Sequence, residues 1–202
     1  MAQAVTETKI ETVAACLREG GVVLLPTDTV YGLAVSPEYP EAVARLFALK
    51  QRPAQRNLPV MVADLEALGP LGLERTPVMD RLAASSFVPG ALTLAVGFSE
   101  RPRPIWLEGR EEVAFRIPNH PFLLALLRTM GPLLVTSANG HGMATAERVE
   151  GILPQLSGRP DLVIDGGTLS GDPSTLVNCR VDPPRVEREG VIPEKTIREL
   201  LA

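Results

Sequence analysis

The chain has 202 residues, of which 45% are hydrophobic and 22% charged, a composition typical of one globular domain with a substantial buried core. Twenty Lys and Arg against 24 Asp and Glu give a net charge of −4, which excludes the overall positive field of many nucleic-acid-binding domains. Two cysteines exclude a disulfide framework and no apolar run is long enough to cross a bilayer, so we expect a cytoplasmic protein without a membrane segment.

Helical and strand patterns alternate along the whole chain. Apolar residues recur at helical spacing in some segments, as at Ile10, Val13 and Leu17, and form short continuous runs in others. In the first third of the chain these patterns predict a helix over residues 8–18, strands over 22–25 and 32–35, a helix over 40–49 and a strand over 58–62. In the middle they predict helical turns around Leu65 and over 79–84, strands over 92–97 and 113–117, a helix over 121–128 and a strand over 133–136. In the last third they predict a helix over 145–156, strands over 162–164 and 175–181, and a last helix over 193–201. This alternation predicts an α/β fold with a mixed sheet, as a single domain over residues 1–202.

Polar residues follow several of the predicted strands. They are Thr27, Thr29 and Tyr31 after the first strand, Arg116 at the end of the strand over 113–117, Ser137 and Asn139 after the strand over 133–136, and Asp165-Gly166-Gly167 after the strand over 162–164. Ligands of open α/β sheets bind beyond the carboxyl ends of strands, so these residues indicate a ligand site. Each residue also fits ordinary turn chemistry, and the pattern leaves the ligand unidentified.

Two cations, Lys50 and Arg52, stand at the end of the predicted helix over residues 40–49, which Pro53 prevents from continuing. At an exposed helix end the two side chains can converge on an anion. The alternative is a pair of surface cations that interact favourably with the helix dipole. Both interpretations place the two side chains at the surface.

The sequence contains no P-loop, no strand-linked dinucleotide-binding glycine pattern and no nucleophile elbow. His120 is interpreted as a residue at a helix start. His141, which lies closer to the expected site, is interpreted either as a solvated loop residue or as a catalytic residue. Cys179 lies in an apolar strand and is interpreted as core. Metal ligands at a recognisable spacing are also absent from the sequence.

Six short segments occur in a characteristic order along the chain. They are P-T-D-T-V-Y-G-L at residues 26–33, K-Q-R-P at 50–53, P-G-A-L-T at 89–93, V-A-F-R-I-P at 113–118, S-A-N at 137–139 and S-T at 174–175. Together they resemble the YrdC-like threonylcarbamoyl-AMP synthases, over about residues 8 to 195. The chain is similar to the short form of that family, which lacks an additional C-terminal domain.

The resemblance implies a twisted sheet of parallel and antiparallel strands, flanked by helices, with a concave and positively lined ligand cavity. It implies that L-threonine, bicarbonate (or CO2) and ATP react to give L-threonylcarbamoyladenylate and pyrophosphate. The resemblance further implies that downstream threonylcarbamoyl-transferase machinery uses this product to modify adenosine 37 of tRNA. Mg2+ is expected to arrive with ATP, with no tightly bound cofactor and no dedicated metal site.

The resemblance also assigns roles to residues at matching positions. Lys50 and Arg52 are implied to be catalytic, because they would neutralise the phosphates of ATP. Further ATP contacts are implied at Arg56, Asn139, Thr145 and Arg188. Contacts to threonine and to the intermediate are implied at Thr29, Met61, Arg116, Ser137 and Ser174. Among these, Arg116 is the natural partner of the substrate carboxylate.

Two positions depart from the family pattern. Met61 stands where the family often has a histidine near the threonine site, and R-E-G at residues 188–190 replaces the usual R-P-G. Met61 is interpreted either as a pocket residue that contacts the threonine methyl group or as a core residue that points away from the site. Tyr31 likewise either walls the pocket or packs in the core.

Two other functions remain open at this point. One is a related carbamoyl-adenylating domain, as in hydrogenase maturation, although such domains usually belong to longer chains with further modules. The other is a non-catalytic module that binds RNA weakly in the concave cavity, although the net charge of −4 and an aromatic content of 4% disfavour it.

Overall fold

The computed structural model describes residues 2–53, 57–169 and 171–201, with residues 2–8 as backbone only. Its elements are α1 Ala2–Arg18, β1 Val23–Leu25, β2 Gly32–Val35, α2 Pro40–Lys50, β3 Val60–Met61, α3 Pro77–Ala83, β4 Leu92–Val96, β5 Val113–Arg116, α4 Pro121–Met130, β6 Leu133–Ser137, α5 Val149–Ile152, β7 Leu162–Val163, β8 Thr175–Asn178, β9 Arg185–Arg188 and α6 Glu194–Leu201. Short 3₁₀ turns lie at Glu66–Leu68, Ile105–Leu107 and Leu153–Gln155.

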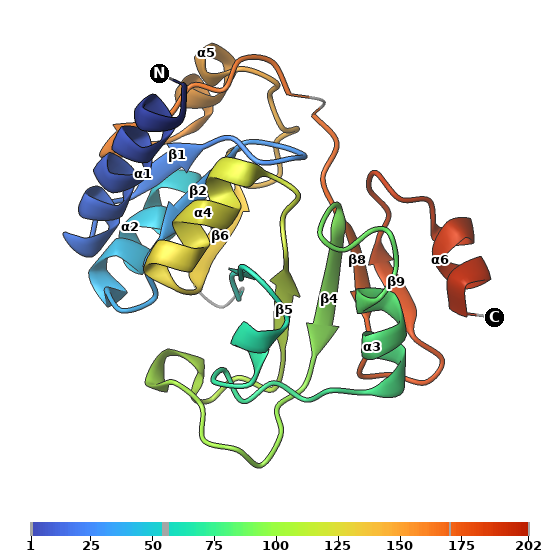
Figure 1. Cartoon of the computed structure of the whole chain (residues 1–202). Coiled ribbons are helices and arrows are strands. Elements are labelled where there is room, and N and C mark those ends of the chain that lie inside the picture. Colours follow the sequence, from blue (N-terminus) through green and yellow to red (C-terminus); the bar gives the residue numbers. More distant parts are fainter. Residues whose placement is uncertain (1, 54–56, 170, 202) are drawn as a thin grey trace.

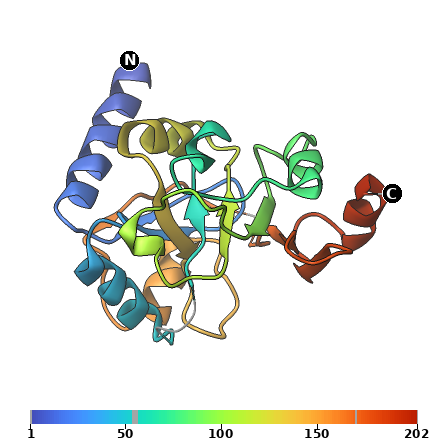
Figure 2. The same cartoon turned by 90° about the horizontal axis from the view of Figure 1, so that it is seen from below.

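Across these residues one sheet carries the strands in the order β7-β1-β2-β6-β3-β5-β4-β8-β9. The pairs β1–β7, β3–β5 and β4–β8 are parallel and the other neighbours are antiparallel. Helices α1 and α4 lie side by side next to β1, β2 and β6, whereas α3 and α6 accompany the β4–β8–β9 end (Figure 1). Figure 2 shows α1 and α6 at opposite ends of the molecule. The predicted mixed α/β sheet with flanking helices is confirmed.

Alternation along each strand assigns its side chains to one of two faces. Leu24, Leu33 and Leu134 belong to one core cluster together with Leu46 of α2. Their strand neighbours, among them Val135, pack in a second cluster with the apolar sides of α1 and α4. The sheet is therefore buried on both faces at its β1–β2–β6 end.

Local sequence signals explain where several helices begin. Proline occupies the first turn of α2, α3 and α4. Backbone N–H groups in the first turn make no hydrogen bond within the helix, so proline, which has no N–H, costs no bond there. Thr76 caps α3 by accepting a 3.1 Å hydrogen bond from Met79 N, and His120 caps α4 by accepting one of 3.4 Å from Leu123 N. The prediction that His120 lies at a helix start is confirmed, and Cys179 is buried in the core as predicted.

Several predicted boundaries were wrong. Helix α1 begins six residues earlier than the apolar pattern indicated, in a stretch whose Ala and Gln are good helix formers. The helix predicted over 145–156 is only the short α5 followed by a 3₁₀ turn, because Pro154 has no N–H to donate to an α-helical hydrogen bond. Strands β3 and β8 are shorter than predicted, and β9, which is mostly exposed and carries three charged residues, was missed.

Candidate active site

A cavity of about 570 Å³ lies on the sheet face that also carries α1 and α4, farther along the sheet. Its floor consists of side chains that alternate onto this face from β6, β3, β5, β4, β8 and β9. The lining residues are Thr27, Thr29, Val30, Tyr31, Gly32, Arg52, Asn57, Leu58, Pro59, Met61, Thr93, Glu112, Ala114, Arg116, Val135, Thr136, Ser137, Pro173, Ser174, Leu176, Glu187 and Arg188. We call it the large cavity.

The turn after β1 supplies one wall of the large cavity. Thr27 Oγ1 donates a 2.7 Å hydrogen bond to Val30 O and accepts one of 3.1 Å from Thr29 N, so a threonine side chain fixes the turn. Tyr31 is 1% exposed and also lines the cavity, so it both packs in the core and forms part of the wall. Its hydroxyl donates to Gly167 O at 2.7 Å and accepts from Gly166 N at 2.8 Å, which ties the loop after β7 to this wall.

Arg116 closes β5 and is held by three acceptors. Its Nε donates to Gly90 O, Nη1 to Thr29 Oγ1 and Nη2 to Asp28 Oδ1, each at 2.8 Å. The Arg116 side chain is 5% exposed, and burial lowers the pKa of its guanidinium while Asp28 opposes that effect. A buried cation with donors left over suits an anionic group in the cavity.

Lys50 does not lie at an exposed helix end, and that prediction was wrong. Its side chain is buried at 2% exposure, and its ammonium donates to Ser137 O, to Asn139 O at 2.7 Å and to Asn139 Oδ1 at 3.3 Å. Burial, followed by the nearby charge of Arg52, lowers the pKa of Lys50 to about 8. Lys50 is not among the described residues that line the large cavity.

The backbone at the end of α2 explains why Lys50 and Arg52 diverge. Gln51 adopts a left-handed conformation with φ 51°, and the N–H groups of Gln51 and Arg52 bond to Ala48 O and Phe47 O, which is a Schellman motif. The chain reverses there, so Arg52 reaches the large cavity while Lys50 turns to the loop after β6. Arg52 also donates a 3.1 Å hydrogen bond to Asn57 O.

Ser137 reaches the large cavity, but Asn139 does not line it. Ser137 Oγ donates to Asn139 Oδ1 at 2.6 Å, and Asn139 Nδ2 donates to Met143 O at 2.6 Å. Thr145 also lies away from the lining and donates to Gly171 O. Of the other residues expected to bind ATP, Arg56 lies outside the described residues.

The opposite wall comes from the C-terminal part of the chain. Ser174 Oγ lies 2.7 Å from Thr93 Oγ1, and Arg188 Nη2 donates to Ser174 O at 2.8 Å. Partial desolvation, together with the charge of Arg116, lowers the pKa of Arg188. Gly190 is required beside this pair, because a Cβ there would lie 2.1 Å from Pro173 O.

Met61 alternates onto the cavity face of β3 and lines the large cavity, although it is only 6% exposed. It also belongs to the core cluster that includes Leu133, its partner on β6. Both interpretations of Met61 therefore describe part of its surroundings. Its role toward threonine stays a prediction.

Charged residues of both signs meet in the large cavity. Arg52, Arg116 and Arg188 face Glu112 and Glu187, and Glu112 is paired with Arg180 at 2.6 Å. Sequence analysis missed both glutamates, because no local pattern distinguishes them from surface acids. Among the described residues there is no group of three or more His, Cys, Asp or Glu that could hold a metal ion, and no helix long and apolar enough to span a membrane.

The family model for Sua5, YciO and YrdC proteins, described as telomere recombination, matches residues 15–190. A threonylcarbamoyl-AMP synthase of Bacillus subtilis is 36% identical, and the match covers 96% of this chain and 57% of that protein. The crystal structure of Pyrococcus abyssi Sua5 complexed with L-threonine has a TM-score of 0.85 at 33% identity, over 97% of this chain and 58% of that one.

The crystal structure of Escherichia coli YciO has a TM-score of 0.82 at 32% identity, over 94% of this chain and 93% of that one. The chain thus spans little more than half of the Bacillus and Pyrococcus proteins and nearly all of YciO. The match of the family model over residues 15–190, with this agreement in fold, shows that the chain belongs to the Sua5/YciO/YrdC family.

Proposed function

We propose that this chain converts L-threonine, bicarbonate (or CO2) and ATP into L-threonylcarbamoyladenylate and pyrophosphate. The observation that carries the proposal is one cavity whose lining brings together three arginines with several hydroxyl side chains, among them Arg52, Arg116, Arg188, Thr29, Ser137 and Ser174. The names of the family relatives support the same assignment.

The reaction needs three substrates to meet in one place. The threonine amine adds to CO2 and loses a proton, which gives a carbamate; starting from bicarbonate, the products are the same carbamate and one water, with no net release of a proton. A carbamate oxygen then attacks the α-phosphorus of ATP, and pyrophosphate leaves with the electron pair of the broken P–O bond. Such a reaction depends on positioning and charge neutralisation and needs no enzyme nucleophile.

The cations of the large cavity fit these requirements. In the proposal Arg116 takes the threonine carboxylate, because it is fixed by three hydrogen bonds and lies beside the Thr29 hydroxyl. Arg52 and Arg188 neutralise phosphates from the two sides of the cavity, and Mg2+ enters with ATP. Ser137 and Ser174 offer hydroxyl groups to the intermediate.

Lys50 and Asn139 are proposed to act on ATP through the loop after β6. In this structure both bond to that loop, and a direct phosphate contact would require their side chains to exchange these bonds. Thr145 and Arg56 remain proposed ATP contacts by resemblance alone. We further propose that residues 1–202 act as one domain in the cytoplasm and that downstream machinery transfers the threonylcarbamoyl group to tRNA.

The test is to incubate the protein with threonine, bicarbonate, ATP and Mg2+ and to detect threonylcarbamoyl-AMP by mass spectrometry. Pyrophosphate release should stop when threonine or bicarbonate is omitted. Equal pyrophosphate release without threonine would contradict the proposal. Formation of carbamoyl-AMP, pyrophosphate and inorganic phosphate from carbamoyl phosphate, water and ATP, without threonine, would favour a carbamoyl-adenylating enzyme. Salt-dependent RNA binding without turnover would favour a binding module.

A further inference from the structure

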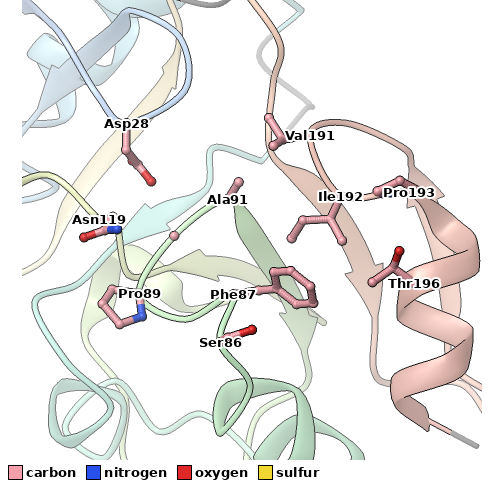
Figure 3. Close-up of a pocket in the computed structure, with 11 residues that line it drawn as sticks. Asp28, Ser86, Phe87, Pro89, Ala91, Asn119, Val191, Ile192, Pro193 and Thr196 are labelled. Atoms are coloured by element: carbon pink, nitrogen blue, oxygen red, sulfur yellow. The ribbon is translucent and has the colours of Figure 1, made fainter.

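Asp28 stands between two cavities. The large cavity lies on one side of the Asp28–Arg116 ion pair and is lined by Arg116 and Thr29. A second cavity of about 380 Å³ is bordered by Asp28 and by the segments around Phe87 and Ile192. Figure 3 shows the Asp28 carboxylate among these residues. Asp28 is not among the described residues that line the large cavity, so a ligand bound there would not need to touch it.

The ion pair is almost completely buried. The side chains of Arg116 and Asp28 are 5% and 12% exposed, and Nη2 and Oδ1 lie 2.8 Å apart. A guanidinium has five N–H donors, and three of those of Arg116 are used by Asp28, Thr29 and Gly90. Two N–H groups remain without a partner among the described residues. The direction in which those two groups point is set by the three bonds already made.

The three acceptors hold Arg116 in different ways. Thr29 and Gly90 offer neutral oxygen atoms, whereas Asp28 offers the charged one. All three hydrogen bonds are 2.8 Å long and come from the same cation, but only Asp28 adds the attraction between two opposite full charges. Removing the counter-charge would leave a buried guanidinium unpaired, which is strongly unfavourable. Asp28 therefore has more influence on the position of the guanidinium than either neutral acceptor.

We propose that Asp28 is a positioning residue that fixes the guanidinium plane of Arg116, so that the two remaining N–H groups face a substrate carboxylate in the large cavity. The inference rests on the proposed function, which supplies threonine as that substrate. Asp28 acts only through Arg116 and makes no contact with substrate.

The variant that tests this role is Asp28→Asn, which keeps an oxygen acceptor at the same place and removes the charge. In steady-state assays of threonylcarbamoyl-AMP formation, we expect kcat/KM for threonine to fall about tenfold or more. The KM for ATP should stay within about twofold, because Arg116 is proposed to hold threonine and not the phosphates. If the ion pair only stabilised the fold, its loss would change kcat/KM for threonine and the KM for ATP together.

Asp161→Asn is the matched control. Asp161 accepts hydrogen bonds from Arg45 and from Val22 N at the β1–β7 end, and it lines neither of the two cavities. This variant also breaks an ion pair, and kcat/KM for threonine should stay within about twofold of the wild type. An equal loss of threonine kcat/KM in both variants would overturn the positioning role.

A double-mutant cycle shows whether Asp28 acts through Arg116. In an Arg116→Ala background, adding Asp28→Asn should change kcat/KM by less than about twofold. A loss as large as in the wild-type background would overturn the proposal. Thermal unfolding checks that each variant folds; if Asp28→Asn does not fold, Asp28→Glu, which moves the charge by one methylene, is judged by the same criteria.

The wild-type assay separates the two proposals. Wild-type protein that forms no threonylcarbamoyl-AMP overturns the proposed function and this inference with it. If the wild-type protein is active and Asp28→Asn has the same kcat/KM for threonine, this inference alone is overturned.

Discussion

The ammonium group of Lys50 lies 2.7 Å from the main-chain carbonyl oxygen of Asn139, 89 residues further along the chain. The contact is reciprocal, since His141 N donates a 2.9 Å hydrogen bond to Lys50 O. The end of α2 and the loop after β6 are thereby joined, and Ser137 is held at the edge of the large cavity.

Replacing Lys50 by methionine should destabilise the protein. The change removes the ammonium donor from the carbonyl oxygens of Ser137 and Asn139, whereas Asn139 Oδ1 keeps its bond from the Ser137 hydroxyl. Each polar group left unsatisfied costs about 1–3 kcal/mol. We expect a loss of about 2–4 kcal/mol, or a fall in Tm of roughly 5–15 °C, measured by circular dichroism. Lys195→Met, at a side chain that is 86% exposed, is the control and should leave Tm almost unchanged. Equal Tm values for Lys50→Met and the wild type would contradict the bonding described here.

The stability difference between the wild type and Lys50→Met should depend on pH. Below pH 8 Lys50 is protonated in both the folded and the unfolded chain, so the difference is constant. Between the pKa of about 8 in the folded protein and the ordinary lysine pKa of 10.5 in the unfolded chain, the unfolded chain binds more protons, so the wild type gains stability as pH rises. The difference in free energy of unfolding between the wild type and Lys50→Met should grow by up to roughly 1.4 kcal/mol per pH unit, measured by urea unfolding at pH 7 to 10. A difference in free energy of unfolding that stays constant from pH 7 to 10 would show that the loop carbonyls keep Lys50 charged.

Arg52→Ala should lose activity without losing the fold. Arg52 is partly exposed at the wall of the large cavity, so its removal should cost within about 0.5–1 kcal/mol of stability. Loss of a preorganised phosphate contact should lower kcat on the order of 100-fold, measured as pyrophosphate release. Arg45→Ala removes an exposed cation that is paired with Asp161, and its kcat should match that of the wild type. If Arg52→Ala kept more than about half of the activity, its phosphate role would be abandoned.

Met61→Ala should weaken the choice of threonine over serine. The two substrates share a hydroxyl group and differ by one methyl, whose packing is worth about 1–3 kcal/mol in an apolar pocket. Because Met61 lines the large cavity, we expect the threonine-to-serine ratio of kcat/KM to fall roughly 5- to 50-fold, with the KM for ATP little changed. Val60→Ala, on the opposite face of β3, is the control for general destabilisation. An unchanged ratio in folded Met61→Ala would leave threonine selectivity to other residues.

Much of the fold could be predicted because it depends on local patterns. The apolar runs of β1 and β2, the proline-initiated helices and the turn fixed by Thr27 all follow from residues close together in sequence. The clustering of Thr29, Arg116 and Ser137 was also indicated, because polar residues at strand ends meet at one part of a sheet, whereas Ser174 was implied by the family resemblance alone.

The sequence by itself therefore determined most of the helices and strands and indicated several of the residues that line the large cavity. Only the tertiary structure decided which way the charged side chains turn. Lys50 and Arg52 are two residues apart, yet a left-handed Gln51 sends one into the loop after β6 and the other into the cavity. Asp28 and Arg116 are paired across 88 residues of sequence. Burial of a charge requires a partner, and which partner is within reach is decided by the packing of distant segments and not by local pattern.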